Sequence, residues 1–166
     1  MPKSDISERQ RVELETPITT YLKQNGIPFR VLMQSREAVS IEDTAALRGI
    51  TPNMMVKTMV LRDMGNRYAL ACCPGDRQID PKKVRAVLQS RRMTCVDSSD
   101  IEALTGYKVG TVTPLLLKTP MPIVFDHTLQ STPIITISSG ERIAGIELAL
   151  SDLCAQCAPT WSDIIR

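Results

Sequence analysis

The spacing of apolar and polar residues along the chain predicts short helices alternating with strands. Thr16 followed by Pro17 is typical of a helix start, with threonine as the N-cap and proline at the first helical position, and Gly26 ends this helix. Ser40 with Asp43 predicts a capping box for a helix over 41–47. Further helices are expected after Asp80-Pro81, from an Asp97 cap with Asp100 to Gly106, and over 149–157.

The strongest strand signal is a hairpin near the middle of the chain. Two apolar runs, 54–62 and 67–73, flank the turn-forming segment Asp63-Met64-Gly65-Asn66. Lys57 is a single charge within the first run, and its neighbour Thr58 points to the opposite face of the strand. Further strands are expected at 27–33, 93–96, 115–117, 123–125, 134–138 and 142–148.

These elements predict a mixed α/β (α+β) fold. About seven strands interleaved irregularly with short helices favour a curled, partly antiparallel sheet with the helices around it. A chain of 166 residues has the length of one ordinary domain with a buried core. Residues 1–13 are polar and charged, so we expect a flexible tail there and a single domain over 14–166.

Charge and composition exclude several classes of function. The net charge of +2 argues against a protein that coats nucleic acid, and an aromatic content of 4% disfavours a platform that stacks successive bases. No apolar run approaches the roughly 20 residues of a membrane-spanning helix, and the N-terminus lacks the apolar stretch of a secretory signal. Without such a run we expect no membrane partner. The odd number of cysteines, 5, together with the missing signal, predicts free thiols and a cytoplasmic location.

The histidine and cysteine content speaks against a metal site. His127 is the 1 histidine, which excludes sites that need two, and Asp126-His127 is typical of a turn at the end of a strand. Cys154 and Cys157 have the spacing of a redox or zinc half-site, but they fall at the end of a predicted helix. The adjacent Cys72-Cys73 pair points to opposite faces of a strand. We therefore expect no metal and no cofactor.

Two features remain as candidates for function. Lys57 indicates either a cavity beside its strand or an exposed edge that the charge protects from aggregation. The segment from Gly106 to Pro114 has two glycines, two threonines and a proline, which favour a bent backbone with free N–H groups suited to a carbonyl or phosphate oxygen. The alternative for this segment is a plain connecting loop.

Five segments resemble the YbaK/EbsC family, whose bacterial domains are similar to the editing domain inserted in prolyl-tRNA synthetase. The resemblance covers roughly residues 15–158, and the order and spacing of the segments carry it. The matching segments are Val56-Lys57-Thr58; Pro74-Gly75-Asp76 with Ile79-Asp80 and Lys82-Lys83; Thr105-Gly106-Tyr107 with Val109-Gly110 and Pro114; Ser138 with Gly140 and Arg142; and Ile146-Glu147-Leu148 with Asp152-Leu153.

The resemblance implies a YbaK-like fold and a free-standing enzyme that deacylates mischarged aminoacyl-tRNA, such as tRNA-Pro with a small wrong amino acid. Editing of this kind compensates for a synthetase pocket that cannot reject a similar side chain by binding alone. Lys57 matches the family's strand lysine, expected to position the ester and stabilise negative charge at the tRNA acceptor end. Prolyl-tRNA synthetase is a second candidate partner. The expected substrate-binding residues are Thr58, Gly110, Thr111, Val112, Pro114, Ser138 and Gly140.

The chain departs from the family pattern at three places. The family's tyrosine after the first helix has no counterpart in 29–34, an aspartate of the family aligns with Gly145, and Ser139 stands in a family Ser-Gly-Gly turn. The specificity for Cys-tRNA therefore does not carry over, and alanine, serine and threonine esters are equally open. Two other hypotheses also stay open: a catalytically silent module that binds tRNA or a synthetase, and a thiol protein that acts through Cys154 and Cys157.

Overall fold

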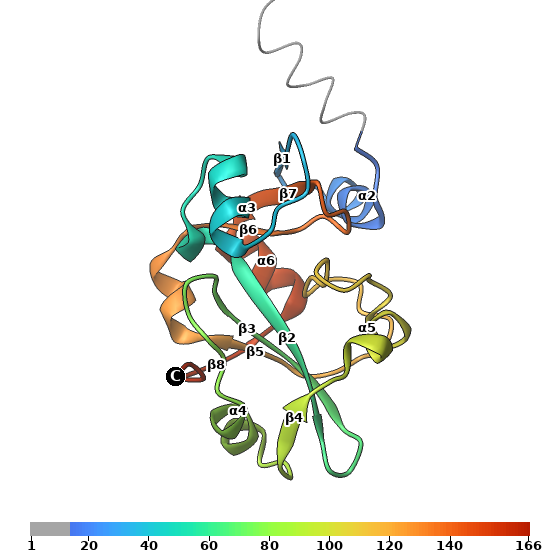
Figure 1. Cartoon of the computed structure of the whole chain (residues 1–166), viewed down its shortest axis with the longest axis vertical. Helices are drawn as coiled ribbons and strands as arrows, with labels where there is room; N and C mark the ends of the chain where they lie inside the picture. The colour runs from blue at the N-terminus through green and yellow to red at the C-terminus, as the bar shows by residue number, and fades with distance from the viewer. Residues whose placement is uncertain (1–13) are drawn as a thin grey trace, which may run out of the picture.

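The computed structural model describes residues 14–166, so the expected flexible tail over 1–13 lies outside the described residues. In Figure 1, β1, β6 and β7 lie in the upper part of the molecule beside α2 and α3, whereas β2 and β3 run down toward β4 and α4. The helices are α2 (Pro17–Gln24), α3 (Ile41–Arg48), α4 (Pro81–Leu88), α5 (Ser98–Thr105) and α6 (Leu150–Cys157), with 3-10 turns η1 (Pro52–Met54) and η2 (His127–Ser131). The strands are β1 (Arg30–Met33), β2 (Val56–Asp63), β3 (Tyr68–Pro74), β4 (Met93–Cys95), β5 (Ile123–Asp126), β6 (Ile134–Ser138), β7 (Ala144–Ala149) and β8 (Thr160–Ser162).

The mixed α/β fold is confirmed, and its strands form two sheets. A sheet of 5 strands has the order β4-β2-β3-β5-β8, in which β4, β2 and β3 are antiparallel neighbours and β5 and β8 are added in parallel. A sheet of 3 antiparallel strands has the order β1-β7-β6. An isolated parallel bridge from Met55 to Thr136 connects the start of β2 with β6. Both sheets therefore meet where β2 begins.

Local capping explains where the helices begin. The Thr16 hydroxyl accepts a hydrogen bond from the Thr19 amide, and the Thr19 hydroxyl accepts one from the Thr16 amide, which makes a reciprocal cap for α2. Ser40 caps α3 by accepting from the Asp43 amide. Asp97 occupies the expected N-cap position of α5, but its side chain accepts no hydrogen bond from the first turn of the helix.

The structure corrects three predicted strands and adds one. Residues 115–117 form no strand, because this segment is a bend in which the Leu115 carbonyl accepts the hydroxyl of buried Tyr107. The first strand begins only at Arg30, and the strand expected over 142–148 begins at Ala144. Sequence reasoning missed β8, where Trp161 packs edge-on against Phe125 with ring centroids 5.4 Å apart.

The two faces of the β2–β3 hairpin contribute to different hydrophobic cores. Val56, Val60 and Cys72 belong to a core shared with α2, α6 and the smaller sheet. Leu61 and Cys73 belong to a second core, which α4 covers. The prediction that Cys72 and Cys73 point to opposite faces is confirmed. Because successive strand residues alternate between the faces, Lys57 lies on the α4 side of the sheet and Thr58 on the other.

Candidate functional site

A cleft of about 640 Å³ lies along an open edge of β2. Among the described residues, β4 pairs with β2 only from Leu61 to Asp63, and β6 contacts the other end through the Met55 bridge. The stretch between these two contacts has no neighbouring strand on that side, so its backbone edge faces the cleft. A volume of this size suits a small ligand or the end of a larger one.

The cleft contains five of the eight predicted site residues. Lys57, Thr58, Gly110, Val112 and Ser138 line it. Three residues do not: Thr111, Pro114 and Gly140. Thr111 is 1% exposed, and both its amide and its hydroxyl donate to the Lys108 carbonyl, at 2.9 and 2.8 Å. Thr111 therefore shapes the loop from inside and does not face the cleft.

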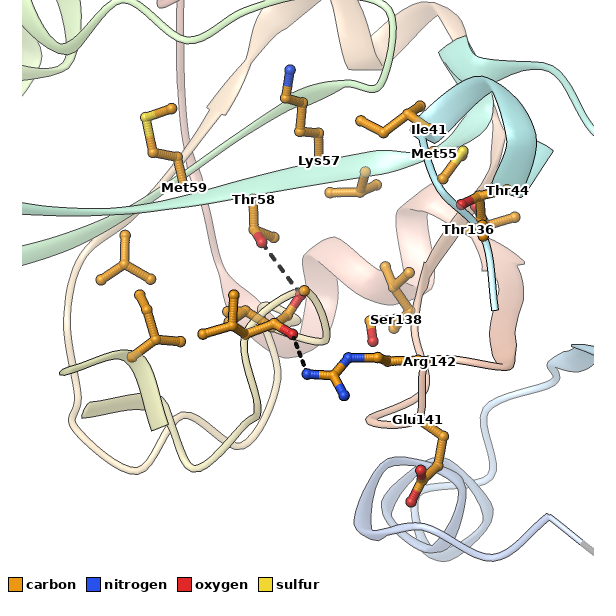
Figure 2. Close-up of a pocket in the computed structure, with 18 of the residues that line it drawn as sticks. Ile41, Thr44, Met55, Lys57, Thr58, Met59, Thr136, Ser138, Glu141 and Arg142 are labelled. Carbon is orange, nitrogen blue, oxygen red and sulfur yellow. Dashed lines mark hydrogen bonds between the residues drawn. The ribbon is translucent and has the colours of Figure 1, made fainter. Parts of the chain in front are cut away.

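Lys57 and Thr58 border the cleft from opposite faces of β2, as Figure 2 shows. The half-buried Lys57 side chain donates from Nζ to the Arg77 carbonyl at 2.9 Å. The Thr58 hydroxyl donates to the Val112 carbonyl at 3.3 Å, which ties β2 to the glycine loop. The ammonium and the loop are therefore separated by the open edge of β2, and a group that contacts both must cross this edge.

The loop from Tyr107 to Pro114 is held at both ends and open in the middle. The Tyr107 amide donates to the Thr105 hydroxyl at 3.1 Å, and its phenol donates to the Leu115 carbonyl. Gly110 has a φ of 84°, a left-handed conformation that glycine adopts without strain. Within residues 14–166, the amides of Gly110 and Val112 donate to no protein group. These amides are therefore available to an oxygen of a ligand.

Several polar residues that line the cleft were not predicted as site residues, and Arg48, Thr136 and Arg142 are the three whose contacts bear most on its chemistry. Arg48, at the end of α3, donates from Nε to the Gln34 Oε1 at 2.8 Å, and burial lowers the pKa of its guanidinium to about 10. Thr136 is 1% exposed. Arg142 donates to the Val109 carbonyl at 3.2 Å and so holds the glycine loop against the turn after β6. In sequence Arg48 has the pattern of an ordinary basic residue in the last helical turn.

The other candidate groups do not converge on a site. In the described part of the chain, no group of three or more His, Cys, Asp or Glu side chains has a metal-binding arrangement. Asp126 accepts hydrogen bonds from the Thr128 amide and hydroxyl and from the Ile164 amide, so it fixes the turn that begins with exposed His127. Burial raises the pKa of Cys157 to about 12, which disfavours the thiolate that the thiol hypothesis requires.

Comparison with known proteins identifies the family. The sequence model of the aminoacyl-tRNA editing domain matches residues 35–154. The chain belongs to this family. It is 27% identical over 145 residues to "Putative Cys-tRNA(Pro)/Cys-tRNA(Cys) deacylase EbsC" of Enterococcus faecalis, an alignment that covers 85% of this chain and 87% of that protein. The resemblance found in the sequence motifs is thereby confirmed.

Two further relatives place the family domain in context. A proline–tRNA ligase of Desulfovibrio desulfuricans is 28% identical over 140 residues, which cover 84% of this chain but only 24% of the ligase. The solved structure of "a putative trans-editing enzyme for prolyl tRNA synthetase" has a TM-score of 0.81 at 19% identity, and the match covers 92% of this chain and 99% of that chain. At this identity the structural match establishes the shared YbaK-like fold.

Proposed function

We propose that the protein hydrolyses the ester of a mischarged aminoacyl-tRNA as a free-standing trans-editing enzyme. One observation carries this proposal: in a chain that belongs to the editing family, Lys57, Thr58, the Gly110 loop and Ser138 line the same cleft. The substrate would be tRNA-Pro, or a related tRNA, that carries a small wrong amino acid, which relates the activity to the names of both curated relatives. A tRNA substrate would be met in the cytoplasm, which supports a cytoplasmic location, and prolyl-tRNA synthetase is a candidate partner.

The chemistry needs little more than positioning, because an aminoacyl ester is already activated. The attacking atom bonds to the carbonyl carbon and gives up its proton, the bond from that carbon to the ribose oxygen breaks, and the ribose oxygen takes up a proton. Water as the attacking group hydrolyses the ester directly. A substrate side chain instead releases the tRNA by forming a cyclic product that water opens later, and a ribose hydroxyl only moves the acyl group to a neighbouring oxygen, so water must then complete the hydrolysis. Negative charge develops on the carbonyl oxygen during the attack. The free amides of Gly110 and Val112 are suited to stabilise it. The Lys57 ammonium would hold the phosphate or ribose of the terminal nucleotide on the other side of the β2 edge.

A basic groove next to the cleft supports contact with tRNA. The groove is lined by four cationic residues, Lys82, Arg85, Arg92 and Arg166, by one acidic residue, Asp80, and by Met93 and Thr94 of β4. The next residues along the chain, Cys95 and Val96, line the cleft, so the groove and the cleft adjoin through β4. None of these four cations forms an ion pair within residues 14–166. With the acceptor end in the cleft, phosphates of the acceptor stem would therefore meet unpaired positive charge.

Deacylation of a panel of charged tRNAs tests the proposal. Prolyl-, alanyl-, cysteinyl-, seryl- and threonyl-tRNA-Pro are incubated with the wild type and with Lys57→Ala, and the remaining ester is measured over time. We expect wild-type hydrolysis of one or more mischarged esters and a loss of roughly 10²-fold in Lys57→Ala, the size of effect that a misplaced substrate typically has. Lys23→Ala, which removes an exposed lysine of α2 outside the cleft, is the matched control and should keep full activity.

The same panel separates the alternatives. Wild-type protein that binds tRNA in a filter assay but hydrolyses none of the esters would favour the silent binding module. Activity that survives Lys57→Ala but is lost after alkylation would favour the thiol hypothesis. Circular dichroism of each variant shows whether a loss of activity has a structural cause.

A further inference from the structure

Arg48 places an uncompensated positive charge inside the cleft. Its Nε donates to the Gln34 Oε1 at 2.8 Å, and the Gln34 amide nitrogen in turn donates to the Arg36 carbonyl at 3.1 Å. Gln34 is only 6% exposed, so the guanidinium is held by a buried and already anchored side chain. The orientation of Arg48 is therefore fixed before any ligand binds.

No carboxylate neutralises this charge. Within residues 14–166, Arg48 takes part in no ion pair, although Glu37 and Glu141 line the same cleft. Burial lowers the pKa of the guanidinium to about 10, because Arg48 has lost part of its hydration. A partly buried charge without a counter-charge is costly, and the cost is recovered only when an anion binds to it.

Gly145 makes room for the guanidinium. A Cβ atom at position 145 would lie 2.3 Å from Nη1 of Arg48 and 2.7 Å from Cζ, closer than atoms in contact approach. Any other residue at 145 would therefore push the guanidinium out of its position. Gly145 is also the position where the resembling family has an aspartate, so this chain has a cationic group of α3 where an acidic side chain would stand.

Thr136 provides a second polar group that has no partner. It is 1% exposed and lines the cleft, yet its hydroxyl makes no hydrogen bond to the described residues. Thr136 and Ser138 share one face of the smaller sheet with position 145, because Ser138 pairs with Gly145 and Thr136 is two residues away on the same strand. Thr44 of α3, the helix that ends in Arg48, lines the same cleft as Thr136, and both are labelled in Figure 2.

We propose that Arg48, Thr136 and Gly145 form an oxyanion-binding subsite of the cleft. The ligand chemistry is a phosphate or carboxylate oxyanion, which accepts hydrogen bonds from the free guanidinium nitrogens and from the Thr136 hydroxyl. The source is either a phosphate of the tRNA 3′ end or, where the esterified amino acid is acidic instead of one of the small ones proposed above, its side-chain carboxylate. The identity of the ligand rests on the proposed function. The subsite also repels the α-ammonium of the amino acid, which must then lie elsewhere in the cleft.

Equilibrium binding of small probes tests the subsite without any hydrolysis, so its failure is distinct from a failure of the deacylase assay. AMP, adenosine and N-acetylaspartate are titrated at low salt and monitored by backbone amide NMR shifts. We expect the oxyanion probe to bind wild type and to bind Arg48→Gln roughly 10- to 100-fold more weakly, as is typical for a hydrogen bond to a charged group. If Arg48→Gln weakens the binding of AMP but not of adenosine, the ligand group is a phosphate. If it weakens the binding of N-acetylaspartate, the ligand group is a carboxylate.

Three further variants control for structure. Gly145→Ala keeps Arg48 but displaces its guanidinium, and it should weaken the same probe. Thr136→Val should weaken the probe without lowering the thermal midpoint of the free protein, because it removes a buried hydroxyl that has no partner. Arg62→Gln removes an exposed arginine of β2 outside the cleft and should change nothing. The proposal is overturned if wild type binds neither oxyanion probe at millimolar concentration, or if Arg48→Gln binds both as wild type does.

Discussion

Gly75 lies where β3 ends against the segment that leads into β2, and replacing it with alanine is expected to destabilise the protein. The buried Gly75 amide donates to the Pro52 carbonyl at 3.1 Å and to the Met55 carbonyl at 2.9 Å. An alanine Cβ would lie 2.6 Å from the Pro52 oxygen and 3.2 Å from side-chain carbons of Ile41 and Met55. Because the closest atom belongs to the backbone of Pro52, η1 must move to relieve the overlap. Met55 directly follows η1 and should therefore move with it.

The size of the effect follows from this overlap. Forcing an extra methyl group into packed surroundings costs about 1–3 kcal/mol. With a typical urea m-value of about 2 kcal/mol/M, the unfolding midpoint should fall by about 0.5–1.5 M at an unchanged m-value. Urea unfolding followed by far-UV circular dichroism measures both quantities. Since Met55 leads into Lys57, we also expect slower deacylation by the folded variant.

Gly65→Ala is the matched control in the hairpin turn between β2 and β3. Its Cβ would meet nothing closer than 3.4 Å, from the Asp63 side chain, and the backbone at Gly65 does not have a left-handed φ. The unfolding midpoint of Gly65→Ala should therefore stay near the wild-type value or rise slightly, because alanine reduces the entropy of the unfolded chain. A Gly75→Ala variant as stable as Gly65→Ala would refute the steric reasoning.

Three more predictions follow from single groups. Iodoacetamide should label Cys95 before the other thiols of the folded protein, because Cys95 is exposed, whereas burial raises the pKa of Cys73 to about 11. Mass spectrometry of the labelled peptides measures the order of labelling, and early labelling of Cys73 would contradict the prediction. Replacing Arg85 and Arg92 by alanine should raise KM for charged tRNA at unchanged kcat. The slope of the logarithm of the tRNA binding constant against the logarithm of salt concentration, measured between 50 and 200 mM salt, should become shallower by about 1 for each residue removed. An unchanged slope would exclude the groove as a phosphate site. Burial acts to raise the pKa of Asp126, but hydrogen bonds from Thr128 and Ile164 outweigh it and hold the pKa below the usual value. The stability that Asp126 contributes is therefore present above the ordinary pKa near 4 and lost as the pH falls through the lowered pKa, so Asp126→Asn should show a shallower fall of the unfolding free energy below about pH 4.

Local signals in the sequence determined most of the secondary structure. The turn at 63–66 and the apolar runs beside it specify the β2–β3 hairpin, because the pairing of adjacent segments depends on the turn and on the two strands that it joins. Thr16 and Ser40 specify the starts of α2 and α3, since a cap acts over one helical turn. The motif residues Lys57 and Gly110 were also recognisable in the sequence, and both line the cleft.

Only the tertiary structure decided how these parts form a cleft. The open edge of β2 exists because β4 is too short to cover it and β6 joins at one residue, and no local signal reports which strands from distant segments pair. Strand β8 forms because Trp161 has the ring of Phe125 to pack against, which a run of three residues does not reveal.

The clearest case of tertiary control is Arg48. In sequence Arg48 is one basic residue at a helix end, and Gly145 is one glycine in a strand 97 positions further along the chain. Folding brings α3 across β7, and the missing side chain at 145 then becomes the space that the guanidinium fills. Sequence determines which groups are present and how each short segment folds, whereas burial, approach distance and lost hydration are properties of pairs of segments that only folding brings together.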